Sequence, residues 1–292
     1  MIPFWEPRVR RHTSRIDRIL SKSLIAICAV VLWPGFLDAQ SASQLVNRMV
    51  QNELGAAKND HSYWMYQDSN TDKGRTTIDE VLQTPEGWMR RLVSVNGKPP
   101  TPDEEKKSED ELHKFLSDPD YRKQEHEKVL QDGKKATDLL SMLPSAFLYT
   151  ARGRQGRTIR FSFRPNPKFH PPTREAKVFH SMAGMLLIDS KDMRLMRLSG
   201  HLIEDVDFGF GILGKLSKGG TFEVDQADVG GGHWEMTKLD VHISGHALFF
   251  ATIKEQQHEI MTGFHEVPPG TTLAEAAEML KRPTESSMPG RK

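Results

Sequence analysis

The spacing of hydrophobic residues along the chain begins with a helical period. Five apolar side chains recur at intervals of three and four positions: Leu45, Val46, Met49, Val50 and Leu54. Ser41 and Gln44 stand just before this run with the spacing of a capping box. The pattern predicts an amphipathic helix over about 42–57, ending near Gly55, whose apolar stripe needs a partner surface.

Beyond residue 62 the hydrophobic period changes to two, which is typical of strands. The expected strands cover 63–69, 75–83 and 88–95. Turn sequences separate them, at Asn70–Gly74 and at Thr84–Gly87. Short strands joined by short turns predict an antiparallel meander.

Residues 101–143 interrupt the strand pattern with a charged helical insertion. Thr101, Pro102 and Glu104 combine an N-cap, a first-turn proline and a capping-box glutamate, and Asp118–Pro119 repeats the cap and the proline. Opposite charges follow at helical spacing, so most of the insertion is expected to be solvated. Its expected anchors are the apolar positions Leu112, Phe115, Leu116, Leu139, Leu140 and Leu143.

After the insertion the strand period returns and continues for more than a hundred residues. Phe161 and Phe163 alternate with Ser162 and Arg164, and later segments repeat this one-sided pattern. One covered and one solvated sheet face follow from such alternation. Because few helical segments are left for parallel crossovers, the predicted class is α+β: an antiparallel sheet of about ten strands with the amphipathic helix against it.

The first 39 residues have the features of a secretory signal peptide, with an uncleaved membrane anchor as the alternative. Six basic side chains accompany an apolar run over 24–37, and Ala39 offers a small residue for cleavage. Without this segment the formal net charge changes from +1 to −2 and no cysteine is left. Thiol catalysis, disulfides and a nucleic-acid partner are therefore not expected. Residues 40–281 are expected to form a single domain, and 282–292 a disordered tail.

Several strand and turn motifs resemble those of the LolA/LolB-like lipoprotein-carrier superfamily, in an uncharacterised secreted branch. They are Gly184–Asp189, Met193–Leu198, Gly214–Gln226, His233–Trp234, Glu259–Phe264 and the upstream Asn96–Pro100. The similarity spans roughly residues 60–267. It implies an incomplete β-barrel, a large curved antiparallel sheet wrapped around the N-terminal helix, with an apolar concave cavity for acyl chains or hydrophobic peptides.

Aromatic and aliphatic residues supply candidates for the lining of such a cavity. The segment 206–213 alternates bulky apolar residues with Gly209 and Gly211, which fits either a strand approached closely by another element or a mobile apolar flap. Core packing is the alternative for every candidate. The ligand-binding candidates are Trp64, Tyr66, Trp88, Phe161, Phe163, Phe208, Phe210 and Ile212.

No motif in the sequence points to a reaction. His242 and His246 have the spacing of a zinc pair, but a turn at Ser244–Gly245 separates them and no glutamate lies between them. The glycines 230–232 lead into a strand rather than into a helix N-terminus, which is where phosphate is bound. We therefore expect no enzyme activity, no metal and no cofactor.

The sequence favours a non-enzymatic periplasmic or secreted protein that shields a hydrophobic ligand, such as an acyl chain, a lipid or a lipidated peptide. Transient contact with a membrane surface fits this function. The alternative is an envelope sensor or assembly subunit that docks a protein partner through 101–143.

Overall fold

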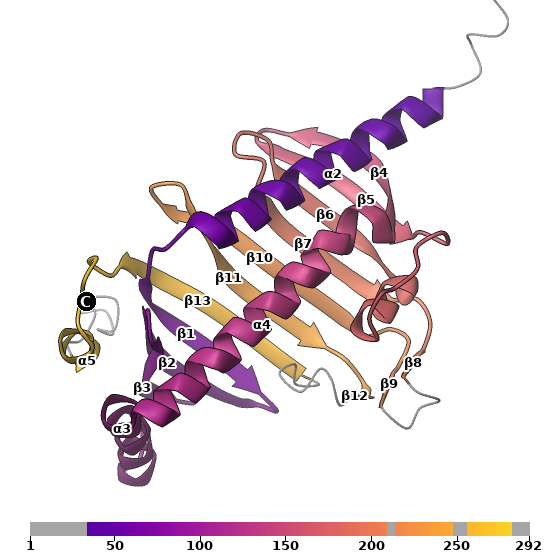
Figure 1. Cartoon of the computed structure of the whole chain (residues 1–292). Helices are drawn as coiled ribbons and strands as arrows, with labels where there is room; N and C mark the ends of the chain where they lie inside the picture. Colours follow the sequence, from indigo (N-terminus) through magenta and orange to yellow (C-terminus); the bar gives the residue numbers. More distant parts are fainter. Residues whose placement is uncertain (1–33, 209–213, 248–255, 282–292) are drawn as a thin grey trace, which may run out of the picture.

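The computed structural model describes residues 34–208, 214–247 and 256–281. It has an α+β fold with one ten-stranded antiparallel sheet and a small three-stranded sheet (Figure 1). The expected tail over 282–292 and residues 1–33 of the expected signal peptide lie outside the described residues.

The large sheet is open, with β3 and β4 as its edges, in the order β3-β2-β1-β13-β11-β10-β7-β6-β5-β4. Its strands are β1 (Trp64–Asp72), β2 (Arg75–Thr84), β3 (Gly87–Val95), β4 (Phe147–Gln155), β5 (Thr158–Pro165), β6 (Met182–Asp189), β7 (Leu195–Leu202), β10 (Thr221–Gly230), β11 (His233–His242) and β13 (Gln256–Glu266). The small sheet contains β8 (Val206–Phe208), β9 (Gly214–Leu216) and β12 (Gly245–Ala247). The predicted antiparallel sheet of about ten strands is confirmed.

The helices are α2 (Pro34–Asn59), α3 (Pro102–Ser117), α4 (Pro119–Ala146), the 3-10 helix η1 (Glu175–Ser181) and α5 (Leu273–Lys281). Helix α2 is longer than the predicted helix over about 42–57, and helix α4 continues beyond residue 143, the expected end of the insertion. Both predicted caps of the insertion are present: Thr101 forms a capping box with Glu104, and Asp118 accepts from two backbone N–H groups of α4. The N-terminal helix starts earlier than residue 42 and runs through Gly55, where a helix end was expected.

Helices α2 and α4 lie across the same face of the large sheet, here called the inner face (Figure 1). The main sheet contacts of α2 are with β4 and β7, and those of α4 are with the two edge strands. Val46, Met49 and Val50 of α2 pack against Phe161 and Leu186 of the sheet. Helix α4 is thus part of the covering layer of the fold, a position that the sequence did not predict. Most of the insertion is solvent-exposed, as expected, and its buried residues Phe115 and Leu143 are two of the predicted anchors.

The opposite, outer face is covered at only one end in the described part of the chain. There α3 and α5 pack on β1–β3, where Phe115 and Leu280 contact the cluster around Leu82 and Met89. Phe115 is 4% exposed, so the predicted anchor of the insertion is a core residue.

One buried ion pair joins α2 to the sheet. Glu53 accepts hydrogen bonds from Arg194 Nε at 2.8 Å, from Arg194 Nη2 at 3.0 Å and from the backbone N–H of Leu195 at 2.7 Å. The side chains of Glu53 and Arg194 are 6% and 14% exposed. A bidentate pair this deeply buried sets the position of the helix relative to the start of β7.

Two glycines, Gly184 and Gly200, face each other across strands β6 and β7. A Cβ atom on Gly184 would lie 2.0 Å from the carbonyl oxygen of Ser199 and 2.6 Å from Gly200 Cα. The rings of Phe163 and Phe222 lie against these glycines from the neighbouring strands. The sheet at this point therefore requires residues without side chains.

We predict that Gly184→Ala destabilises the protein by about 3 kcal/mol, because backbone atoms on β7 would have to move to admit a methyl group. Gly133→Ala is the matched control, since Gly133 lies in α4 with nothing within 4 Å of its would-be Cβ. This control should raise stability by about 0.5–1 kcal/mol. Urea unfolding measures both, and equal midpoints for the two variants would contradict the close approach of β6 and β7.

Candidate functional site

The predicted cavity residues whose side chains the structure describes do not line one cavity. Phe161 and Phe163 are 1% and 4% exposed and belong to the main core beneath α2 and α4. Trp64 and Tyr66 form a second cluster, with Val81 and Met261, in which burial raises the pKa of Tyr66 to about 12. Trp88 is 40% exposed on β3. Phe208 ends β8, and its side chain, like Phe210 and Ile212, lies outside the described residues.

The inner face becomes gradually less covered along one row of cross-strand neighbours. The row runs through Phe161, Leu186, Leu198, Val224, Leu239 and Glu259, on β5, β6, β7, β10, β11 and β13. Phe161 and Leu186 are fully buried, whereas Leu198, Val224 and Leu239 are only half-buried. The helices cover the β5–β6 end of the row more completely than its middle.

Four half-buried residues form an apolar surface in this middle region, here called the inner strip: Leu198, Phe222, Val224 and Leu239. Leu198 and Phe222 touch the edge of the main core. Beyond the strip the row becomes polar. Asn70 Nδ2 donates to Glu259 Oε1 at 2.5 Å, and the side-chain amide of Gln257 donates to the same oxygen at 2.7 Å. The strip therefore runs from the closed core to a hydrogen-bonded polar group.

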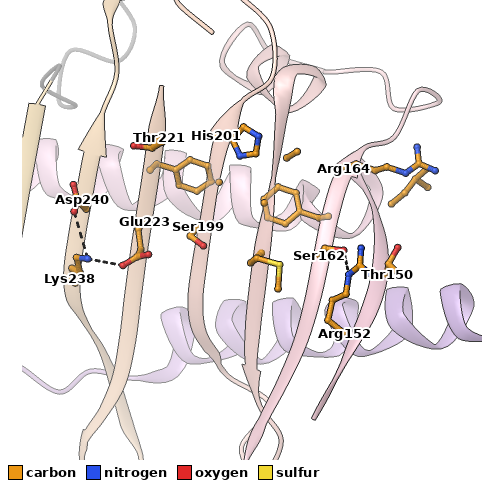
Figure 2. Close-up of a pocket in the computed structure, with 17 residues that line it drawn as sticks. Thr150, Arg152, Ser162, Arg164, Ser199, His201, Thr221, Glu223, Lys238 and Asp240 are labelled. Atoms are coloured by element: carbon orange, nitrogen blue, oxygen red, sulfur yellow. Dashed lines mark hydrogen bonds and ion pairs between the residues drawn. The ribbon is translucent and has the colours of Figure 1, made fainter. Parts of the chain in front are cut away.

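The outer face carries a groove of roughly 780 Å³ over β4, β5, β6, β7, β10 and β11. Its lining mixes polar side chains with apolar ones, among them the rings of Phe163 and Phe222. Figure 2 shows this face with the helices behind the sheet. At the β10–β11 end, Lys238 lies 2.7 Å from Glu223 and 3.7 Å from Asp240. At the β4–β5 end, Arg152 donates to the Ser162 hydroxyl at 2.8 Å. Charges are paired at one end of the groove, while the other end is cationic.

A cluster of polar side chains, here called the polar brace, joins the segment after α2 to the start of β11. His233 Nδ1 lies 2.8 Å from Asp60 Oδ2 and 3.2 Å from the Ser62 hydroxyl. Ser62 donates to Asp60 Oδ1 at 2.6 Å, and the Trp64 indole donates to Ser62 at 3.1 Å. A catalytic triad needs the carboxylate and the serine on different imidazole nitrogens. Here both lie on Nδ1, so the residues hold one another rather than activate a nucleophile.

Titration of the polar brace is set by burial and by these hydrogen bonds. Burial acts to raise the pKa of Asp60, but hydrogen bonds from Ser62 and His233 outweigh it and lower that pKa to about 2. The hydrogen bond to Asp60 raises the pKa of His233. Burial, assisted by the charge of Asp60, raises the pKa of the nearby Glu235 to about 7.

The chain matches no known protein family and no curated protein. In the described ranges, no three His, Cys, Asp or Glu side chains converge on a position for a metal ion. Over the same ranges, no helix is long and apolar enough to cross a membrane. The side chain of His246 is outside the described residues, while the predicted strand–turn–strand at His242 is confirmed by the break between β11 and β12.

The polar brace and the outer groove were not foreseen from the sequence. Asp60 and His233 lie 173 positions apart, and no local motif links them. Most of the residues that line the groove are ordinary solvent-facing residues of alternating strands, and the unusual feature among them is the pair Gly184 and Gly200.

We predict that the polar brace and the nearby Glu235 make stability fall as the pH rises from about 5 to 8. Glu235 and His233 have raised pKa values, so their contribution is complete below the unfolded-state pKa and is lost as the pH rises through the folded-state pKa. Asp60 acts oppositely, because its contribution is lost only as the pH falls toward about 2. Glu235→Gln should abolish about 1–2 kcal/mol of the loss at high pH.

Urea unfolding across this pH range is the measurement, with Glu127→Gln on the exposed side of α4 as the control. The control should keep the pH profile of the unsubstituted protein. A Glu235→Gln profile identical to that of the control would show that Glu235 does not titrate as its burial requires.

Proposed function

We propose that the protein is a non-enzymatic carrier, exported to the periplasm or the outside of the cell, that binds an apolar chain on the inner face of its sheet. The chain would belong to a lipid, an acyl group or a lipidated peptide. The observation that carries this proposal is the inner strip, an apolar surface that the covering helices leave half-exposed.

The arrangement of the covering helices supports this site. The main contacts of α2 and α4 with the sheet are at β3, β4 and β7, whereas the strip is centred on β10 and β11. An apolar chain laid on Val224 and Leu239 would extend the core outward from Phe161 and Leu186 along the same row. Burial of apolar surface contributes roughly 2.5 kcal/mol per 100 Å².

The polar end of the row supports an amphipathic ligand. Glu259 and Asn70 follow directly after Leu239 on the inner face. A ligand with its apolar chain on the strip would place a hydrogen-bonding group beside these two side chains. The resemblance to lipoprotein carriers implies an open sheet curved around α2 as an incomplete barrel. Such curvature would bring the inner strip and the covering helices together around the apolar chain of the ligand.

The alternative function, docking of a protein partner through residues 101–143, has less support from the packing of this insertion. Leu112, Phe115 and Leu116 pack against the sheet and α5 cluster, and Leu139 and Leu140 pack against the main core. Leu130, at 57% exposed, is the large hydrophobic side chain that the insertion leaves in solvent. One isolated apolar residue is ordinary for a surface and does not make a docking stripe.

We predict that the protein purified from a bacterial periplasm carries a lipid that native mass spectrometry and lipid extraction detect. Leu239→Asp should reduce the bound fraction by about tenfold, because a carboxylate would be desolvated against the apolar chain. Val224→Trp should also reduce it by filling the strip without adding charge. The matched control is His242→Asp, which changes an exposed position at the end of the same strand.

Thermal melting shows whether each variant is folded. Retention of lipid by the folded Leu239→Asp and Val224→Trp variants would exclude the inner strip as the site. A protein that stays free of lipid after incubation with lipids and lipopeptides would refute the carrier function.

A further inference from the structure

Basic residues are strongly segregated in one part of the chain. Residues 139–174 contain seven Lys and Arg side chains and no Asp or Glu. This stretch includes β4 and β5, which form the hairpin 147–165 at one edge of the large sheet. Without residues 1–39 the chain has a net charge of −2, so the part of it outside 139–174 carries an excess of negative charge.

Four arginines of the hairpin have no carboxylate partner within the described ranges, and all four are exposed: Arg152, Arg154, Arg160 and Arg164. Arg152 donates to the Ser162 hydroxyl, and Arg160 donates to the Gln155 side chain. Arg154 donates to the Gly156 carbonyl at 2.9 Å and to the Ser190 hydroxyl at 2.8 Å. These neutral acceptors leave the positive charges uncompensated. The four residues are here called the basic hairpin arginines.

Arginines elsewhere in the fold pair differently. Arg157, at the turn of the same hairpin, lies 2.9 Å from Asp189 and 3.0 Å from Asp192. Arg194 pairs with Glu53, and Arg197 pairs with Asp225 at 2.5 Å. Within the described ranges Arg122 also lacks a carboxylate and donates to the backbone carbonyls of Phe115 and Leu116. What distinguishes the hairpin is that four such arginines lie on the same two strands.

The basic hairpin arginines border an accessible surface that also has an apolar component. Arg152 and Arg164 line the cationic end of the outer groove (Figure 2). Leu148, which is directly opposite Arg164 in the hairpin register, is 37% exposed. Arg164 beside an exposed leucine, with Arg152 in the same groove lining, matches the interface of a bilayer, where phosphates lie just outside apolar chains.

We propose that this edge of the sheet docks on the surface of an anionic lipid bilayer, with the basic hairpin arginines bound to lipid phosphates. Single-stranded nucleic acid is a poorer fit, because its binding needs exposed aromatic rings for base stacking. The aromatic residues of the hairpin are all buried, each 6% exposed or less: Phe147, Tyr149, Phe161 and Phe163. The ring of Phe163 reaches the lining of the outer groove but offers almost no surface for stacking. The proposal does not depend on the ligand of the inner strip.

Flotation with lipid vesicles tests the proposal on the chain without residues 1–39. The protein should bind vesicles that contain phosphatidylglycerol, bind vesicles of phosphatidylcholine at least about tenfold more weakly, and be released by high salt. Changing all four basic hairpin arginines to Gln should lower binding by at least about tenfold, and changing all four to Lys should preserve most of it.

The control variant replaces Lys106, Lys107, Lys134 and Lys135 with Gln. It removes the same number of positive charges from exposed positions of α3 and α4, so it should float with the vesicles as the unsubstituted protein does. Circular dichroism establishes that the variants are folded.

Three results would overturn the proposal. One is equal binding to both kinds of vesicle, and another is an equal loss of binding in the hairpin and control variants. The third is complete displacement of the protein from vesicles by double-stranded DNA at equal phosphate concentration, which would identify nucleic acid as the occupant.

Discussion

An open ten-stranded sheet must cover the apolar side of its strands, and this requirement governs the rest of the structure. Edge strands that do not meet cannot enclose a core by themselves, so helices have to supply the second layer. Helix α2, which precedes the sheet in the sequence, and helix α4, which lies in the insertion between β3 and β4, form this layer. Two helices do not cover ten strands evenly. The half-exposed inner strip around Val224 and Leu239 is the consequence.

The position of helix α2 is specified by polar contacts as well as by apolar ones. Side chains such as Val46 and Met49 could pack against the sheet in several orientations, because hydrophobic contact is not directional. Glu53 has one geometry that satisfies both Arg194 and the backbone of Leu195. The polar brace then holds the chain leaving α2 against the start of β11. Both contacts lie toward the same end of α2, so they specify how far along the sheet the helix reaches.

Local signals in the sequence predict most of the elements but not their arrangement. The caps at Thr101 and Asp118 and the change of hydrophobic period near residue 62 predict the helices and the first strands, because these signals act within a few residues. Alternation in β5 predicts which side of the strand is buried, but not whether Phe161 faces a ligand or a helix. The pairing of β1 with β13, and the path of α4 over the sheet, depend on residues far apart in the chain. The polar brace could not be predicted for the same reason.

The inner face of the sheet is largely apolar and the outer face carries charged residues, and the alternation of side chains along each strand explains this difference. Each strand presents alternate residues to opposite sides, so apolar residues that build the core oblige their neighbours to face solvent. On β10 and β11 those neighbours neutralise one another, as Glu223 does with Lys238. On β4 and β5 they are arginines without acidic neighbours, although the inner residues of the same strands are the best buried aromatics of the core. Packing of the core requires Phe161 and Phe163, but it places no requirement on the charge of Arg160, Ser162 and Arg164 between and beside them. An uncompensated group of positive charges at the edge of the sheet is therefore a property that stability does not explain, and that the proposed docking on an anionic surface would explain.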